Sequence, residues 1–373
     1  CPTRPLLTNP FMPTSKTNWL LSAPISATSE KAETPLFKYL ARLMHGEDLS
    51  AKDASLFFRA IIDPNIGSIQ IAAALTALTA KGETHEELAG MADVMRAAAI
   101  KIKSPKMAVD IAGTGSSAAK TFNVSTAAAL VAAGAGAVIA KQSNRGVTSK
   151  SGSADVLESL GVKPASEPQI AQASLSGAGL TFLFAPKFHP ALRRVADVRG
   201  RLGIRTCMNL LGLLANPAGV SRHLIGVWHK SLVEPMAKAL ALLKAENSWV
   251  VHGNDGLDEI TLGGKTFVGT VKNGEVKPYL ISPSDFGLRA AKTDHLKAVT
   301  PKESAAIIRD VLASRRRDEA RSLIVLNAAA AIYLAGLANN PVQAARLAEQ
   351  SIDSGMAQTR LDRLIQVTNK KVS

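Results

Sequence analysis

Apolar residues recur at helical spacing through the first third of the chain, from Thr34 to about Ile100. This pattern predicts short amphipathic helices rather than strands. Helix-breaking residues interrupt it at three points and divide it into about four helices: Gly46, Asp63–Pro64 and Gly82. Residues 34–105 are therefore expected to form a small helical domain.

Helix start signals occur where that pattern requires them. Thr34 before Pro35 is an N-cap followed by proline at the first helical position. Thr84 with Glu87 forms a full capping box, in which each side chain accepts from the other residue's backbone N–H. Ser50 with Asp53 is the same pattern with a shorter acid.

After Lys106 the pattern changes to short apolar runs, each ended by loop residues and followed by a helical segment. Alternation of this kind predicts a mostly parallel sheet with covering helices. The turn at Lys272–Gly274 joins the last two runs as a hairpin. The expected strands are Met107–Ala112, Ala137–Lys141, Leu180–Ala185, His223–Val227, Trp249–His252, Thr266–Val271 and Glu275–Ile281.

Two further segments are expected to be helical. Val198–Leu214 interrupts the strand–helix alternation, so we expect it to pack back on the N-terminal helices. From Pro301 onward the chain is helical again. The predicted organisation is thus a tail over residues 1–33 without ordered structure, a helical domain over 34–105 and an α/β domain over 106–373.

Composition narrows the class of protein. Of the 373 residues 46% are hydrophobic, which is enough for a large core, and Ala-rich runs such as Ala127–Ala129 predict closely packed helices. Two cysteines, Cys1 and Cys207, give no disulfide framework, so a reducing, cytoplasmic setting is the default expectation. No apolar run approaches the roughly 20 residues of a membrane helix, and no membrane partner is expected.

The formal net charge of +14 has three explanations: a polyanionic small substrate, nucleic acid, or solubility alone. Lysine and arginine are spread along the chain. The densest run, Arg315–Arg317, is most simply a solvated helix start. Charge by itself therefore does not choose between these partners.

Ligands of open α/β sheets bind where strands end and helices begin, and three polar, glycine-bearing segments follow predicted strands. The first runs from Asp110 to Thr126. Its glycines let the backbone approach a phosphate, and the helix that follows offers unpaired N–H groups to an anion. Gly113, Gly115 and Ala118 also match the loose dinucleotide pattern, but Lys141 stands where that pattern wants an acid. A phosphate ligand is favoured, with an ordinary turn as the alternative.

The second segment, from Lys141 to Ser153, concentrates cations, hydroxyls and two glycines before a helix near Ala154. Hydroxyls and backbone N–H groups bind phosphate oxygens, and fixed cations hold the charge. The third segment, His252–Glu259, carries adjacent carboxylates. It is a candidate Mg²⁺ site because magnesium binds through one or two carboxylates plus substrate phosphates. Solvated loops are the alternative for both segments.

Taken together, these segments resemble the anthranilate phosphoribosyltransferase family from about Pro35 to the C-terminus. The resemblance implies a helical domain and a larger α/β domain of the nucleoside phosphorylase/phosphoribosyltransferase type, with a site between them and a homodimer. It is carried by Gly113–Gly115, Asn123–Thr126, the loop Lys141–Ser153, Val198–Arg199, Leu202–Thr206, Asn209–Gly212, Asn216–Gly219 and His252–Glu259.

The family implies transfer of the 5-phosphoribosyl group of phosphoribosyl pyrophosphate (PRPP) to anthranilate, giving N-(5-phosphoribosyl)anthranilate and pyrophosphate, in tryptophan biosynthesis. Ser125, Asp258 and Glu259 would bind Mg²⁺, with two ions expected, one arriving with PRPP. Anthranilate would lie against Gly113, Asn144 and Arg199. The residues that would contact PRPP are Gly113, Ser116, Ser117, Thr121, Asn123, Val124, Ser125, Thr126, Lys141, Gln142, Ser143, Asn144, Arg145, Gly146, Val147, Thr148, Ser149 and Ser153.

No side chain is expected to act as a covalent or acid–base catalyst, since the arylamine is already neutral and positioning matters more than a strong base. Departures from the family pattern occur at three places. Ser116 and Ser117 replace Gly-Asp, Gln142 and Ser143 replace His-Gly, and Leu213 replaces a proline. Because the family's His and Pro lie by the acceptor, Gln142 and Leu213 bear on acceptor identity.

Three other functions compete with this interpretation. One is PRPP-dependent transfer to another aromatic amine, and a second is a nucleoside phosphorylase of related fold. The third is a non-catalytic nucleic-acid-binding relative, which the charge of +14 keeps open. The Asp258–Glu259 pair and the segment Asn123–Thr126 favour PRPP chemistry over the last two, so nucleic acid is not the expected partner.

Overall fold

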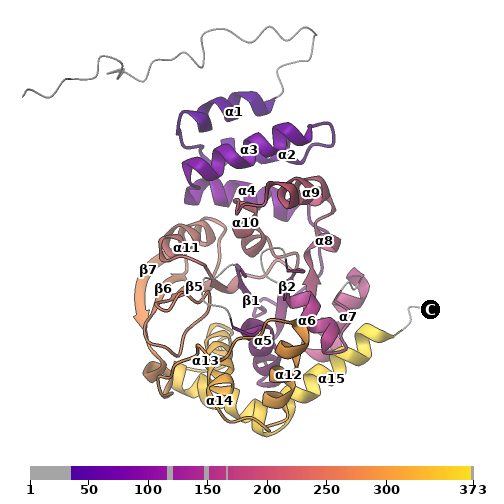
Figure 1. Ribbon diagram of the computed structural model, residues 1–373, viewed down its shortest axis with the longest axis vertical. Coiled ribbons are helices and arrows are strands. Elements are labelled where there is room, and N and C mark those ends of the chain that lie inside the picture. Colours follow the sequence, from indigo (N-terminus) through magenta and orange to yellow (C-terminus); the bar gives the residue numbers. More distant parts are fainter. Residues whose placement is uncertain (1–34, 116–120, 147–150, 165–166, 371–373) are drawn as a thin grey trace, which may run out of the picture.

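The computed structural model describes residues 35–115, 121–146, 151–164 and 167–370. Figure 1 shows a layer of helices at one end of the molecule and a larger α/β body at the other. This arrangement confirms the predicted fold class of a helical domain beside a mostly parallel sheet.

The helical layer contains α1 (Pro35–Met44), α2 (Ala51–Ile62), α3 (Ser68–Lys81) and α4 (His85–Ala97). The capping box at the start of α4 is present in both directions between Thr84 and Glu87. At α2 only one half forms, in which Ser50 Oγ accepts from Asp53 N–H at 3.1 Å. Phe57, Phe58 and other apolar side chains of these helices are fully buried in a common core.

Two helices from the middle of the chain join this layer (Figure 1). They are α9 (Arg193–Leu202), which packs on α3, and α10 (Met208–Leu214), which packs on α4. The sequence analysis expected one helical segment over Val198–Leu214, but the structure has two helices separated by a turn. The chain turns at Gly203, whose φ of +64° lies in the left-handed region that glycine tolerates.

The α/β body is built on one sheet with strand order β3-β2-β1-β4-β5-β6-β7 in the described part of the chain. The first five of these strands are parallel, and β6 and β7 form an antiparallel hairpin at one edge. The strands are β1 (Val109–Gly113), β2 (Ile139–Ser143), β3 (Leu180–Phe184), β4 (Arg222–Gly226), β5 (Asn247–Gly253), β6 (Thr266–Lys272) and β7 (Glu275–Ile281).

Helices cover both faces of the sheet. α11 (Val233–Leu242) packs on one face of the outer strands, while α5 (Val124–Gly134) and α13 (Glu319–Leu334) lie against the inner strands and against each other. The remaining elements are α6 (Ser153–Ser159), α7 (Pro168–Ala178), α8 (Ala185–Phe188), α12 (Pro301–Leu312), α14 (Pro341–Asp353), α15 (Met356–Asn369) and the 3-10 turns η1 (Pro190–Leu192), η2 (Lys230–Leu232) and η3 (Pro283–Phe286).

Small residues allow close packing beneath the sheet. Ala127, Ala128 and Ala129 of α5 are fully buried, as the Ala-rich pattern predicts. A Cβ at Gly134 would lie only 2.2 Å from Ser351 Oγ, so the end of α5 tolerates no side chain there. Among the described residues, no helix combines the length and apolar character needed to cross a membrane.

Candidate functional site

The carboxyl ends of β1, β4 and β5 meet around the loop that carries Asp258. The Asp258 carboxylate accepts hydrogen bonds from Thr114 Oγ at 2.9 Å and from Gly115 N–H at 2.7 Å. Glycine is required beneath this loop, because a Cβ at Gly226 would lie 1.6 Å from the Asp258 carbonyl oxygen. Two of the glycine-bearing segments predicted from the sequence are therefore in direct contact.

Glu259 connects the same loop to the start of α5. Its carboxylate accepts from the backbone N–H of Ser125 at 3.2 Å, in the first turn of that helix. An acid at this position is favoured by the unpaired N–H groups and the positive end of the helix dipole. From the neighbouring strand β2, the buried Lys141 ammonium donates to Ser125 Oγ at 3.2 Å and also to the carbonyl of Ile111.

Burial shifts the acidity of these charged groups. Desolvation raises the pKa of Glu259, and the negative charge of Asp258 raises it further, although Lys141 opposes the shift. Burial likewise lowers the pKa of Lys141, against the attraction of the nearby carboxylates. Asp110 on β1 is buried as well, and this burial raises its pKa to about 6 despite a hydrogen bond from Asn216.

The donor set around Glu259 fits a hard divalent cation. Two adjacent carboxylates and a hydroxyl, Ser125 Oγ, offer oxygen ligands, and a cation between them would favour the ionised form of both acids. Nowhere in the described ranges do three or more His, Cys, Asp or Glu side chains gather as a metal site. A metal held here would take its other ligands from a substrate, as Mg²⁺ commonly does.

The second loop closes against the first through Asn123. Its side-chain oxygen accepts from Ser151 Oγ at 3.1 Å and from Ser304 Oγ of α12 at 3.0 Å. Thr121 Oγ donates to the carbonyl of Leu296 at 2.9 Å. The two described ends of this loop approach closely, since a Cβ at Gly152 would lie 2.2 Å from Gly146 N.

Within the second loop, Asn144 and Arg145 lie at its exposed edge. The backbone N–H of Asn144 donates to Ser153 Oγ at 3.2 Å. Arg145 forms ion pairs with Asp155 at 2.8 Å and Glu158 at 2.6 Å, so in this structure its guanidinium is held by carboxylates of α6. Five predicted PRPP contacts lie outside the described residues: Ser116, Ser117, Val147, Thr148 and Ser149.

A third group of polar side chains faces α10. Arg199 donates to Asn209 Oδ1 at 3.2 Å, and burial lowers the pKa of its guanidinium. Three residues later along α10, Gly212 leaves space beside the Gln142 amide, and a Cβ there would lie 3.7 Å from Gln142 Nε2. Arg199 and Gln142, distant in sequence, thus approach the same helix.

Several buried polar atoms near these strand ends have no hydrogen-bond partner among the described residues. They are Thr126 Oγ, Gln142 Oε1, Ser143 Oγ, Arg199 Nε and Thr206 Oγ. Buried polar groups are nearly always paired, because an unpaired one costs about 1–3 kcal/mol. Two of the five, Gln142 and Ser143, lie at the carboxyl end of β2, where they could receive a polar ligand.

Sequence reasoning missed part of this network. Asn216 donates to Asp110 at 2.7 Å and to Ala140 O at 2.7 Å, tying β1 to β2. Asn209 and Asn216 lie in motifs already noted, but no role was assigned to either. Ser304 offered no signal, because its partner Asn123 is 181 residues away. Among the described residues, no hydrogen bond or ion pair joins Arg199 to the Asp258–Glu259 pair.

Comparisons with known proteins agree with this geometry. Residues 37–99 match the model of the glycosyl transferase family, helical bundle domain, and residues 105–358 match the model of the glycosyl transferase family, a/b domain. An anthranilate phosphoribosyltransferase from Rubrobacter xylanophilus is 46% identical over 331 residues, which cover 89% of this chain and 97% of the relative.

Solved structures give the same result. Anthranilate phosphoribosyltransferase from Thermus thermophilus superposes with a TM-score of 0.83 at 37% identity, over 89% of this chain and 99% of that one. The enzyme from Saccharomyces cerevisiae in complex with PRPP and Mg has a TM-score of 0.80 at 29% identity, over 90% and 98% of the two chains.

Proposed function

The chain belongs to the anthranilate phosphoribosyltransferase family, and from that premise we propose that its site transfers the 5-phosphoribosyl group of PRPP to anthranilate, releasing pyrophosphate, in tryptophan biosynthesis. The observation that carries the proposal is the junction of two loops and the start of α5 at the strand ends. Asp258 joins the loop Gly113–Gly115, and Glu259 joins the start of α5 at Ser125. Carboxylates, helix N–H groups and glycines meet there, as a phosphate–metal ligand requires.

PRPP would lie along the first and second loops. Gly113, Asn123 and the first turn of α5 would face its phosphates, where the positive end of the helix dipole favours an anion. The hydroxyls of Thr126 and Ser143 have no hydrogen-bond partner among the described residues, which supports a polar ligand in this position. The full set proposed for PRPP is Gly113, Ser116, Ser117, Thr121, Asn123, Val124, Ser125, Thr126, Lys141, Gln142, Ser143, Asn144, Arg145, Gly146, Val147, Thr148, Ser149 and Ser153.

Ser125, Asp258 and Glu259 would hold magnesium, and the PRPP–Mg complex of the yeast enzyme supports this cofactor. We propose two ions, one of them arriving with PRPP. When bound, Mg²⁺ supplies positive charge that stabilises the departing pyrophosphate. Lys141 adds a fixed buried cation from β2, although its ammonium also binds Ser125 Oγ and the Ile111 carbonyl.

The acceptor would lie between the second loop and α10. Arg199 would pair with the anthranilate carboxylate, and its buried Nε–H without a partner among the described residues supports an anion there. Gly113 and Asn144 would complete the acceptor contacts. The amine nitrogen bonds to ribose C1 as the bond from C1 to the pyrophosphate oxygen breaks, and the amine then loses one proton to solvent. Because the arylamine is neutral, these residues act by positioning and electrostatics.

An assay with PRPP and Mg²⁺ tests this function directly. Anthranilate should be consumed with release of pyrophosphate, and omission of either PRPP or Mg²⁺ should abolish turnover. A panel of other arylamines tests the second candidate, transfer to a different amine. The unusual Leu213 of α10 and Gln142 beside that helix keep this candidate open. Absence of turnover with every amine, together with salt-sensitive DNA binding, would favour the nucleic-acid alternative instead.

We also propose a homodimer formed through the helical layer. Large apolar side chains of α1, α2 and α3 are exposed there, and exposed apolar surface commonly marks an interface when it is contiguous. They are Phe37, Met44, Leu56 and Ile69, which is 83% exposed. Sedimentation should give twice the chain mass for the wild type and the single chain mass for Ile69→Asp. A cytoplasmic location stays a prediction from the sequence.

A further inference from the structure

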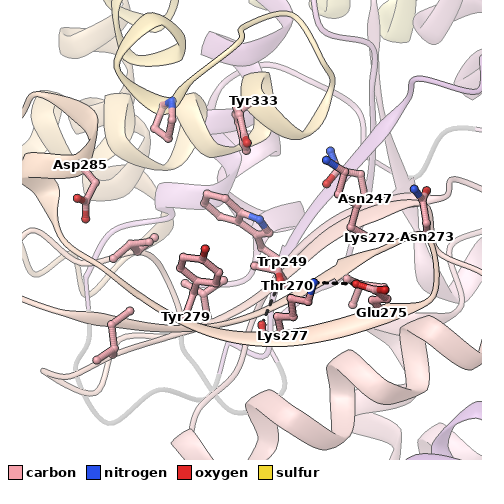
Figure 2. Close-up of a pocket in the computed structure, with 15 residues that line it drawn as sticks. Asn247, Trp249, Thr270, Lys272, Asn273, Glu275, Lys277, Tyr279, Asp285 and Tyr333 are labelled. Carbon is pink, nitrogen blue, oxygen red and sulfur yellow. Dashed lines mark hydrogen bonds and ion pairs between the residues drawn. The ribbon is translucent and has the colours of Figure 1, made fainter.

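A cleft of about 650 Å³ lies at the antiparallel edge of the sheet, away from the carboxyl ends that form the proposed transfer site. Figure 2 shows its floor, formed by β5, β6 and β7, with Tyr333 of α13 above. We name it the outer cleft and define it by six of its lining residues: Asn247, Trp249, Lys272, Asn273, Tyr279 and Tyr333. Its volume suits a small organic ligand.

Strand register explains why these side chains share one face. Trp249, Thr270 and Lys277 are direct neighbours across the three strands, and so are Asn247, Lys272 and Glu275. Alternate residues of a strand point to opposite faces. The other face of the same strands packs on α11, so only the face toward α13 is open.

The centre of the outer cleft is aromatic. The rings of Trp249 and Tyr333 pack with centroids 5.7 Å apart and an interplanar angle of 50°. Tyr279 projects from β7 on the other side of the opening, and its side chain is 61% exposed (Figure 2). Three rings around one opening favour a flat aromatic ligand, since aromatic pairs stabilise beyond the area they bury.

Not every charged side chain at the outer cleft has a partner among the described residues. Glu275 lies opposite Lys272 across the hairpin but forms its ion pair with Lys277, at 2.8 Å. Asp285 accepts from the backbone N–H and the hydroxyl of Ser282 at 2.7 and 2.9 Å. Lys272 alone of these charged groups has no ion-pair or hydrogen-bond partner for its side chain within the described ranges.

We propose that the outer cleft binds an aromatic carboxylate. Its ring would lie among Trp249, Tyr279 and Tyr333, and its carboxylate would pair with the Lys272 ammonium at the hairpin end. The amide of Asn273 lies at that end too (Figure 2) and offers a donor for the second carboxylate oxygen. This site is separate from the transfer site and does not depend on the function proposed for it.

Titration calorimetry with indole-3-propionate tests the proposal on the full chain. The experiment is run on Arg199→Ala as well as on the wild type, so that binding at the proposed acceptor site is recognised. We expect one molecule bound per chain in both proteins. Indole-3-propionamide, which has the same ring and no charge, should bind at least about fivefold more weakly. Competition by anthranilate and by L-tryptophan then distinguishes a benzoate from an aromatic amino acid as the source of the carboxylate.

Substitutions test the contact with the carboxylate and the contact with the ring separately. Lys272→Met and Tyr279→Ser should each weaken indole-3-propionate binding at least about fivefold, while Tyr279→Phe keeps the ring and the affinity. Lys370→Met, at the far end of α15, is the matched control for loss of one exposed lysine. Phosphoribosyl transfer should stay within about twofold in all four. Equal affinity across these variants, or no binding by the wild type, would overturn the proposal.

Discussion

Charged side chains occupy two regions of the sheet under opposite conditions. At the carboxyl ends of the inner strands, Lys141 is 3% exposed and Asp258 is 8% exposed. At the outer hairpin, Lys277 and Glu275 form an ion pair with side chains that remain about two-thirds exposed. Opposite charges therefore meet in both places, but only the inner set is removed from water.

The pKa shifts of the charged groups in the two regions have different causes. Burial raises the pKa of Glu259 and lowers that of Lys141, so each inner charge depends on its neighbours. At the outer pair, direct hydrogen bonding to Lys277 lowers the pKa of Glu275, and water screens the remainder. Substitutions of inner charges should consequently change function strongly, and substitutions of the outer pair Lys277–Glu275 should leave stability and phosphoribosyl transfer nearly unaffected.

The largest effect is expected from replacing both inner carboxylates, in the variant Asp258→Asn with Glu259→Gln. The amides keep the size of each side chain but provide neither charge nor a strong metal ligand. We expect kcat/KM to fall about a thousandfold, equivalent to about 4 kcal/mol of transition-state stabilisation. Circular dichroism should show an intact fold. Glu275→Gln serves as the control, and a double variant with normal turnover at ordinary Mg²⁺ would disprove the metal assignment.

Arg199→Ala should have the next largest effect, on the acceptor alone. The lost charge-assisted hydrogen bond is worth about 1.5–3 kcal/mol, so the KM for anthranilate should rise about 10- to 150-fold. The KM for PRPP should stay within about threefold. Arg201→Ala, an exposed arginine of the same helix, is the matched control. If aniline is used as well as anthranilate by the wild type, Arg199 has been assigned the wrong role.

The sheet itself was largely predictable from the sequence. Short apolar runs ended by loop residues placed each of the seven strands, with ends shifted by up to two residues, as at β1 (Met107–Ala112 expected, Val109–Gly113 observed). The hairpin followed from Asn273 and Gly274, which have φ of +51° and +83° and form a turn with positive φ, a conformation that asparagine and glycine adopt readily. These features depend on residues close in sequence.

Contacts between distant segments were not predictable in the same way. Asn123 is held by Ser304, and Gln142 approaches Gly212, through tertiary packing that leaves no local pattern. The ion pairs of Arg145 with Asp155 and Glu158 of the helix after the loop were likewise not predicted, and the expected contact of Arg145 with PRPP stays a prediction. Motif spacing locates a residue in a loop and does not orient its side chain.

Gln142→Met tests how much a buried polar atom at the inner strand ends costs in stability. The buried Gln142 Oε1 has no hydrogen-bond partner among the described residues, so an apolar side chain of similar shape should remove an uncompensated cost of about 1 kcal/mol. We expect the midpoint of thermal unfolding, measured without ligands, to rise on the order of 1–2 °C. Gln366→Met, at an exposed position of α15, should leave the midpoint unchanged. A lower midpoint in Gln142→Met would mean that this oxygen is hydrogen-bonded in solution.

The smallest effect is expected at the outer pair, in Lys277→Met. An exposed ion pair gains little Coulomb energy in water, loses side-chain freedom and is screened by salt. The midpoint of thermal unfolding should therefore not change measurably at about 0.15 M salt. Lys81→Met provides the contrast, because Lys81 pairs at 3.0 Å with the fully buried Glu87 and its loss leaves a buried acid without its cation. If Lys277→Met destabilised the protein as much as Lys81→Met, burial would not be what separates the two regions, because exposed and buried charge pairs would then contribute alike.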